Sequence, residues 1–264
     1  MKTNIVIALT GLLTTANLFA GPVNITISDG LAGNGNTSPW RNTPGLNAGN
    51  EDNETEPGTT TGDAWDLEAF MQMSGTQLGV VGTFNLKNGY YSGGTTYRMG
   101  DIFFDTAGGV AADGMSGWEY VIHVNWLSGA YNVYANPLSS RITQTTVVAG
   151  ANPYAYNPDG SDTAIASGTY AYSQNNTMGF ASATVGRQHN LAVFDISFLG
   201  DGTTFTNHLT MTCGNDLLMG RGQVSIPPSD PSPVPEGGST LAMFALGLSA
   251  VLGASRRGKA RRRA

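Results

Sequence analysis

The sequence has almost no cysteine, and this excludes two kinds of structural support. Its single cysteine, Cys213, cannot form an intramolecular disulfide bond. A zinc site of the His/Cys type is also excluded, because His123, His189 and His208 are far apart in the sequence and form no cluster. Stability must therefore come from a hydrophobic core, which a body of about 200 residues can supply without cross-links.

Charged residues are scarce as well, at 12% of the chain, about half the usual fraction. Seven of the 13 basic residues lie in the terminal segments, which leaves six basic against 18 acidic residues between Gly21 and Pro233. The net charge of this central part is therefore −12. Because so acidic a body repels phosphate backbones, we expect no nucleic-acid partner, whereas cations are plausible partners.

Recognisable catalytic motifs are absent too. The sequence contains no G-x-S-x-G, H-E-x-x-H, S-x-x-K or glycine-rich phosphate loop, so we do not expect an enzyme. The segment that comes closest to a catalytic motif is WDLEAF, in which Asp66 and Glu68 share one face of a predicted strand. A retaining glycosidase needs carboxyl groups about 5 Å apart. A third acid on the same strand is missing, since Phe70 and Gln72 occupy its positions, and a solvated or cation-binding strand face is the favoured interpretation.

Glycine, by contrast, is abundant, with 36 residues, which indicates many turns and little helix. Alternation of apolar and polar residues dominates the central part, and turn clusters separate the alternating segments. We therefore predict an all-β ectodomain over residues 21–226, an antiparallel β-sandwich of jelly-roll-like type. The polar segment Gly30–Thr61 is expected to be a long loop. The predicted strands are Val23–Ser28, Ala64–Met73, Leu78–Leu86, Gly100–Phe104, Trp118–Trp126, Tyr131–Tyr134, Ile142–Val148, Thr163–Tyr172, Asn190–Leu199, Thr204–Thr212 and Gly222–Ile226.

The first 20 residues have the layout of a secretory signal peptide. Lys2 supplies the positive charge, Ile5–Leu13 is apolar, and small or polar residues precede Ala20. Cleavage is expected between Ala20 and Gly21.

The last part of the chain has three consecutive features. A proline-rich linker over residues 227–233 leads to Val234, Pro235, Glu236 and Gly237, then to an apolar run at Ser239–Ala254, and finally to an arginine-rich end. As a helix, the apolar run would be about 24 Å long, and flanking arginines can extend its reach across a bilayer. By the positive-inside rule the basic end stays cytoplasmic, which places the body outside.

This tail resembles the PEP-CTERM sorting signal of Gram-negative bacteria. The resemblance covers residues 234–264 and implies that an exosortase, an integral membrane enzyme, cuts near Val234-Pro235-Glu236. The second proline of the family's motif is replaced by Gly237. The implied route is export, transient anchoring in the inner membrane, processing, and residence at the cell surface or outside the cell.

The body resembles a recurring, uncharacterised β-rich ectodomain of PEP-CTERM proteins. The segments that carry this resemblance are EDNETEPGTTTGDAWDLEAF, GDIFFDT and TFTNHLTMTCGNDLLMG. It implies the β fold and no known activity, and it assigns no role to the stretch from Cys213 to Asp216.

Two further groups of residues are candidates for binding. Carboxylates crowd into one short stretch and could supply the oxygens that Ca²⁺ requires, although a flexible acidic loop is the favoured interpretation, because a cluster in the sequence does not define ligand geometry. Exposed aromatic residues in loops could stack on sugar rings or simply anchor the loops. Asn157–Asp162 is predicted to be a turn, and His208 and Cys213 to point to opposite faces of one strand. The carboxylates are Glu51, Asp52, Glu54 and Glu56, and the aromatic residues are Trp40, Tyr90, Tyr91, Tyr154 and Tyr156.

Three functional classes remain. The first is a non-enzymatic surface or matrix protein that associates with exopolysaccharide, and the absence of catalytic motifs favours it. The alternatives are a calcium-dependent adhesive module and a secreted glycan hydrolase.

Overall fold

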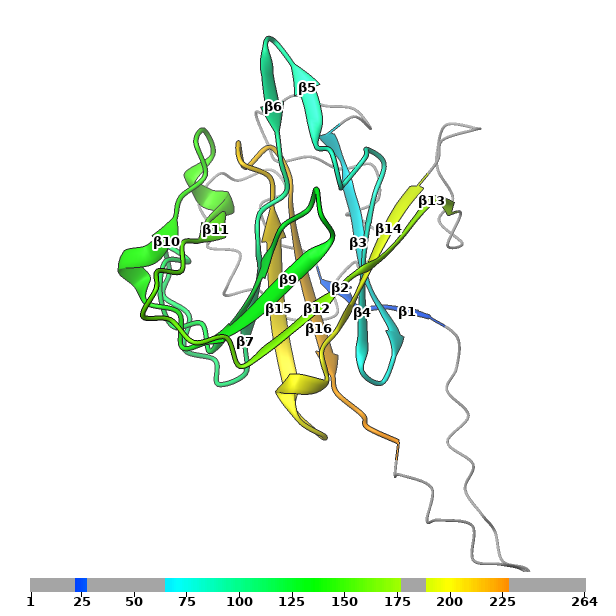
Figure 1. Ribbon diagram of the computed structural model, residues 1–264, viewed down its shortest axis with the longest axis vertical. Coiled ribbons are helices and arrows are strands. Elements are labelled where there is room, and N and C mark those ends of the chain that lie inside the picture. Colours follow the sequence, from blue (N-terminus) through cyan, green and yellow to red (C-terminus); the bar gives the residue numbers. More distant parts are fainter. Residues whose placement is uncertain (1–21, 28–64, 177–188, 228–264) are drawn as a thin grey trace, which may run out of the picture. The chain divides into compact units, whose positions relative to one another are not determined.

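The computed structural model describes residues 22–27, 65–176 and 189–227 (Figure 1). By its internal contacts the chain divides into two units, Met1–Ile226 and Pro227–Ala264. All described residues except Pro227 belong to the first unit. Within its described residues the regular structure consists of β-strands and short 3-10 helices, with no α-helix.

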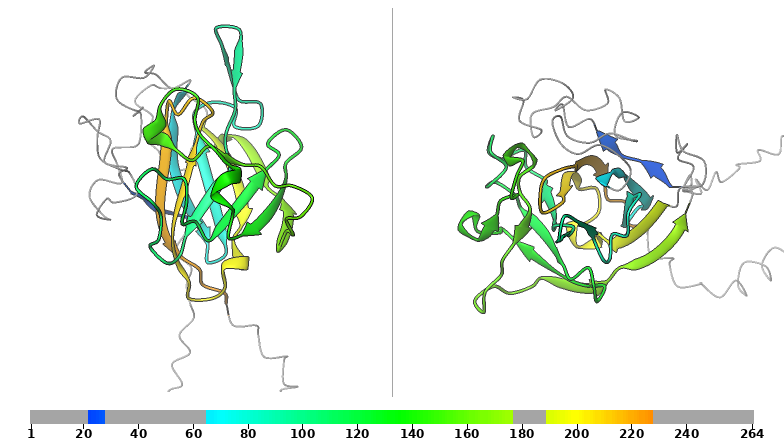
Figure 2. Two further views of the ribbon diagram at one scale, coloured as in Figure 1. Left: turned by 90° about the vertical axis from the view of Figure 1, so that its left-hand side faces the viewer. Right: turned by 90° about the horizontal axis from the view of Figure 1, so that it is seen from above.

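Two antiparallel sheets make up the body (Figures 1 and 2). The larger sheet has the order β12 (Ala166–Thr169), β9 (Ala130–Ala135), β8 (Tyr120–Val124), β7 (Ile102–Asp105), β15 (Thr204–Thr210), β16 (Leu217–Gln223) and β2 (Thr26–Ile27). The smaller sheet has the order β1 (Val23–Asn24), β3 (Leu67–Ser74), β4 (Gln77–Gly82), β14 (His189–Asp195) and β13 (Ala171–Asn176). Half of the neighbouring strands in these sheets are consecutive in the chain, while β4–β14, β7–β15 and β16–β2 join distant segments.

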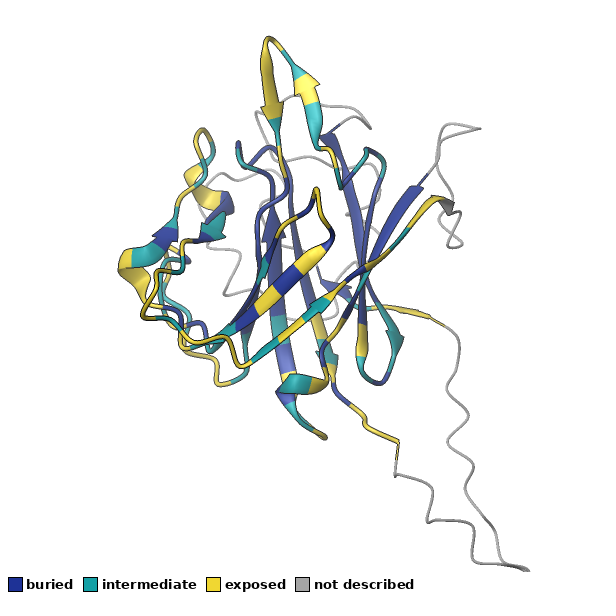
Figure 3. Cartoon of the chain, viewed as in Figure 1, coloured by how far each residue is buried: buried dark blue, intermediate teal, exposed yellow. Residues whose placement is uncertain are grey.

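The main core lies between these sheets because their strands turn alternate apolar side chains inward. In β9, Tyr131 and Val133 are buried while Ala130 and Asn132 are exposed, and Figure 3 shows this alternation along the strand. The core cluster takes side chains such as Phe70 and Phe194 from the smaller sheet and Phe104 from the larger one. This placement of apolar residues on facing strands is what holds a β-sandwich together.

A long excursion between β9 and β12 covers part of the outer face of the larger sheet. It contains the strand pair β10 (Ile142–Thr143) and β11 (Ala155–Tyr156) and the 3-10 helices Ser139–Arg141 and Ala149–Ala151. Ile142 and Tyr156 pack in one cluster with Phe103, Trp118 and Val121 of the underlying sheet region. The larger sheet is therefore buried on both faces near β7 and β8.

The all-β, antiparallel prediction is confirmed, but several strand boundaries were wrong. The predicted strand Thr163–Tyr172 is two strands in different sheets, and Ile142–Val148 pairs over two residues only. The predicted strand Gly222–Ile226 lies mostly beyond β16. The reason is that Leu217, Leu218 and Met219 are all buried, so β16 begins as a continuous apolar run without the expected alternation.

The hairpin of β5 (Tyr90–Ser92) and β6 (Thr95–Tyr97) was not predicted at all. It projects from one end of the sandwich in Figures 1 and 2, and its turn is formed by Gly93 and Gly94, both at positive φ. A Gly-Gly pair between short alternating segments is a known hairpin pattern.

None of the helices in the described parts of the chain has the length and apolarity needed to cross a membrane. The predicted span Ser239–Ala254 falls outside those parts.

Candidate functional site

Most of the residues that the sequence singled out lie outside the described part of the chain. This holds for the sorting motif (Val234, Pro235, Glu236, Gly237), for the cleavage site (Ala20, Gly21) and for the acidic stretch (Glu51, Asp52, Glu54, Glu56). They stay predictions. In the described ranges, no group of three or more His, Cys, Asp and Glu side chains could hold a metal ion.

The interpretation of Asp66 and Glu68 as a solvated strand face was wrong. Both side chains are about 1% exposed, and Glu68 Oε1 lies 3.3 Å from Nε2 of His189, which is buried as well. A β-bulge between Leu67 and Ala69 interrupts the alternation of β3 here, which a simple period of two does not anticipate. Two carboxylates enclosed in this way form no open surface for a cation or a sugar.

The stretch Cys213–Asp216 has a structural role. A carboxylate oxygen of Asp216 accepts a hydrogen bond from the backbone N–H of Leu67, and the Asp216 carbonyl accepts one from Thr210 Oγ1 at 2.8 Å. Asp216 therefore ties the turn after β15 to the start of β3 in the other sheet.

His208 and Cys213 do point to opposite sides of the larger sheet, as predicted, although Cys213 lies beyond the end of β15. Cys213 is buried in the main core, where burial raises the pKa of its thiol. His208 Nε2 donates to the carbonyl oxygen of Pro153 at 2.9 Å on the other side, and burial lowers its pKa to about 3. A neutral histidine and a protonated thiol on different faces cannot act as a catalytic pair.

Asp101 and His123 form the best-defined acid–base pair. His123 Nδ1 donates to Asp101 Oδ2 at 2.9 Å, and this hydrogen bond raises the pKa of His123 against the opposing effect of burial. Asp101 is buried and also accepts from the backbone N–H groups of Val124 (2.9 Å) and Tyr156 (2.7 Å). The carboxylate thus joins β7, β8 and β11, so we interpret it as a structural junction.

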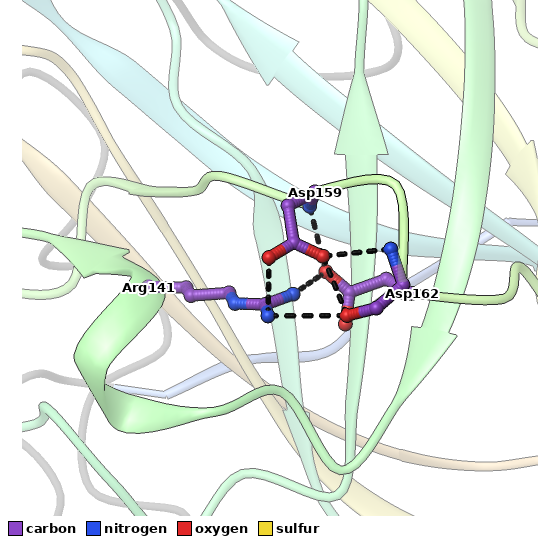
Figure 4. A network of polar contacts seen from close by, with 4 residues as sticks. Arg141, Asp159 and Asp162 are labelled. Carbon is purple, nitrogen blue, oxygen red and sulfur yellow. Dashed lines mark hydrogen bonds and ion pairs between the residues drawn. The ribbon is translucent and has the colours of Figure 1, made fainter.

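The prediction that Asn157–Asp162 forms a turn is confirmed, and the turn is closed by an arginine. Arg141 reaches both Asp159, at 2.5 Å, and Asp162 (Figure 4). Ser161 Oγ donates to Asp159 Oδ1 at 2.6 Å. The guanidinium of Arg141 therefore occupies the position beside the two carboxylates that a bound cation would take.

Of the aromatic residues expected on the surface, Tyr91 alone among those described is strongly exposed, at 68%. Tyr156 belongs to the excursion and is buried against Phe103 and Val121 of the larger sheet. Tyr90 packs edge-on against Trp65, with ring centroids 4.7 Å apart. Trp40 lies outside the described ranges. The anchoring interpretation therefore applies to Tyr90 and Tyr156.

A half-open groove of about 380 Å³ lies on the outer face of the larger sheet. Its floor is formed by β15, β16, β2 and the end of β7, and its wall by the loop that follows β7 and by Trp118. The polar side chains Asp105, Thr206 and Arg221 line it together with apolar Ile27 and Met219. Sequence reasoning missed this group, because its members meet only through the pairing of distant strands.

The comparisons with known proteins concern the tail. Residues 233–257 match the family model described as the VPDSG-CTERM motif. Read against the five letters of that name, Val234, Pro235 and Gly238 are identical, while Glu236 replaces Asp and Gly237 replaces Ser. Neither the curated proteins nor the solved structures gave a match to the chain.

This match confirms that the chain ends in a sorting signal of the PEP-CTERM type. It also accounts for Gly237, because the VPDSG form of the motif has a small residue where the Pro-Glu-Pro form has its second proline. The motif points to export and to a location at the cell surface or outside the cell.

Proposed function

We propose that the protein is a non-enzymatic component of the cell surface or extracellular matrix that associates with exopolysaccharide. The observation that carries the proposal is the VPDSG-CTERM match at residues 233–257. A predicted signal peptide at the other end and a body poor in charge agree with an exported protein.

We further propose that an exosortase-like enzyme removes the tail while Ser239–Ala254 holds the chain in the inner membrane. Pro235 fixes the local backbone and lacks an N–H donor, and the two glycines after Glu236 oppose helix formation. Together with the proline-rich linker they would present an extended segment beside the membrane. A permanent anchor would need only the apolar helix and its flanking charges.

The association with exopolysaccharide is tested in the producing bacterium. The protein is quantified in the surface fraction and in the medium, for cells with and without exopolysaccharide synthesis. We expect the protein to move into the medium when the polymer is absent. Equal retention on both kinds of cell would contradict the proposal.

A second experiment tests the alternative that the protein is a glycan hydrolase. The purified protein is incubated with isolated exopolysaccharide, and new reducing ends are counted. We expect none above the background, whereas release in proportion to the protein added would favour a glycan hydrolase.

A further inference from the structure

Three polar side chains lie in one row across adjacent strands on the floor of the groove. The register pairs Asp105 of β7 with Thr206 of β15, and Thr206 with Arg221 of β16. Neighbouring strands lie about 4.8 Å apart, so the backbones at Asp105 and Arg221 are separated by roughly 10 Å with Thr206 between them. All three side chains face the groove. The row therefore offers an acceptor, a hydroxyl and a donor in sequence.

The acceptor end of the row is held in place before any ligand arrives. Asp105 Oδ1 accepts from the backbone N–H groups of Ala107 at 3.0 Å and Gly108 at 2.5 Å. Next to it, the N–H of Thr106 donates to Glu119 Oε2 at 2.7 Å. A carboxylate fixed by its own loop loses little freedom when it binds a ligand.

The donor end of the row is a cation. Arg221 is exposed, and within the described ranges its guanidinium forms no ion pair. Beside the row, Ile27 and Met219 are buried apolar residues. The indole of Trp118 is fixed by its hydrogen bond to the Gly114 carbonyl at 2.7 Å. The groove thus combines a polar row with an apolar border, as sites for polar organic ligands do.

The charges select among ligand classes. The charges of Asp105 and Arg221 cancel, so the polar row has no net charge. The central part of the chain has a net charge of −12, which repels polyanions. Alternating acceptors, hydroxyls and donors match the hydroxyl groups of a neutral sugar, each of which both donates and accepts. A half-open groove leaves the two ends of a bound segment free to continue as a polymer.

We propose that this groove binds a short segment of a neutral polysaccharide, with Asp105, Thr206 and Arg221 as the residues that hold its hydroxyl groups. The proposal rests on the proposed function and names the site and ligand class for it. Asp105 is the one carboxylate among the described residues that line the groove. A hydrolytic pair of carboxylates is therefore not what this surface presents.

The test measures binding of the full chain to defined oligosaccharides by calorimetry. The probes are neutral glucan and mannan oligomers, alginate oligomers as the acidic class, and short unstructured peptides as a different class. Arg221→Gln and Thr206→Val remove the donor and the hydroxyl while keeping residues that suit a strand surface. Arg98→Gln is the matched control, since it removes an exposed arginine outside the groove. Melting temperatures verify that all variants fold.

We expect neutral oligomers to bind, and each groove variant to weaken binding roughly tenfold, as the loss of one hydrogen bond to a charged or polar group predicts. Arg98→Gln should bind like the wild type. If neutral oligomers bind equally well to all variants, the site is wrong while the proposed function stands. If alginate or peptide binds in their place, the ligand class is wrong. If no polysaccharide binds at all, the site and the proposed function both fail.

Discussion

At the scale of single residues, the buried carboxylate of Asp101 holds three separate segments together. It accepts two backbone N–H groups and the ring of His123, and so it connects the larger sheet to the excursion that covers it. Sequence reasoning gave Asp101 no role, because its partners Val124 and Tyr156 are distant in the chain. The signal was an acid directly before the apolar run Ile102–Phe104, and burying such an acid is costly unless it is paired.

Asp101→Ala should lower the free energy of unfolding by about 2–5 kcal/mol, because two buried N–H donors lose their acceptor. Urea unfolding measures the change. Asp113→Ala, at an exposed turn, serves as the control and should change stability by less than about 1 kcal/mol. Equal effects of the two substitutions would show that Asp101 is not a junction.

His123 makes stability depend on pH in a defined direction. Its pKa is raised above 6.5, first by the hydrogen bond to Asp101, so protonation favours the folded state. The resulting stabilisation is full below pH 6.5 and is lost as the pH rises through the higher pKa of the folded protein. His208 works in the opposite direction, since its pKa is lowered to about 3 and acid destabilises the fold through it.

Melting curves of the wild type and His123→Gln between pH 5.5 and 8.5 isolate the contribution of His123, because His208 is present in both proteins. The advantage of the wild type should be larger at the acidic end of this range and shrink toward the alkaline end. A difference that stays constant with pH would rule out the linkage.

The acidic stretch stays open as a calcium site. If Glu51, Asp52, Glu54 and Glu56 bind Ca²⁺, millimolar Ca²⁺ should raise the melting temperature by mass action. Replacing all four by Gln or Asn should abolish the shift. If Ca²⁺ does not shift the melting temperature, or shifts it equally in the substituted protein, these four residues do not form a calcium site.

At the scale of elements, the sequence predicted the position of β9 well and the position of β16 poorly. β9 alternates between buried and exposed positions, and its prediction was close to the observed strand. β16 begins with four buried residues, and its predicted position was wrong. The pairing of β7 with β15, which creates the groove, could not be predicted, because a period of two says which side a residue faces and not which strand lies beside it.

A close approach of two elements makes Gly100 irreplaceable. A Cβ atom there would lie 2.0 Å from the carbonyl oxygen of Tyr154, whereas one at Gly150 would meet nothing within 4 Å. Gly100→Ala should therefore separate the excursion from β7 and cost roughly 1–3 kcal/mol or more. Gly150→Ala should change stability by less than about 1 kcal/mol. Thermal unfolding of the two variants distinguishes them, and matching melting temperatures would refute the close contact.

At the scale of the whole molecule, the strongest prediction from sequence was the order of parts at the C-terminus. Linker, Val-Pro-Glu, apolar run and basic end are contiguous, so no folding is needed to recognise them, and the VPDSG-CTERM match agrees. The groove could not be recognised in this way. Asp105 and Thr206 are more than 100 positions apart in the chain, and only the pairing of β7 with β15 brings them together.

The central claim, that the tail is a temporary anchor, is tested most directly by the intact mass of the protein recovered from the cell surface. The account predicts a mass that ends near Glu236, and accumulation of the uncut chain in the inner membrane when Pro235-Glu236 is replaced by Ala-Ala. Insertion itself should not change, since the apolar run and the basic end are untouched. A surface protein that still carries the chain through Ala264 would contradict the claim.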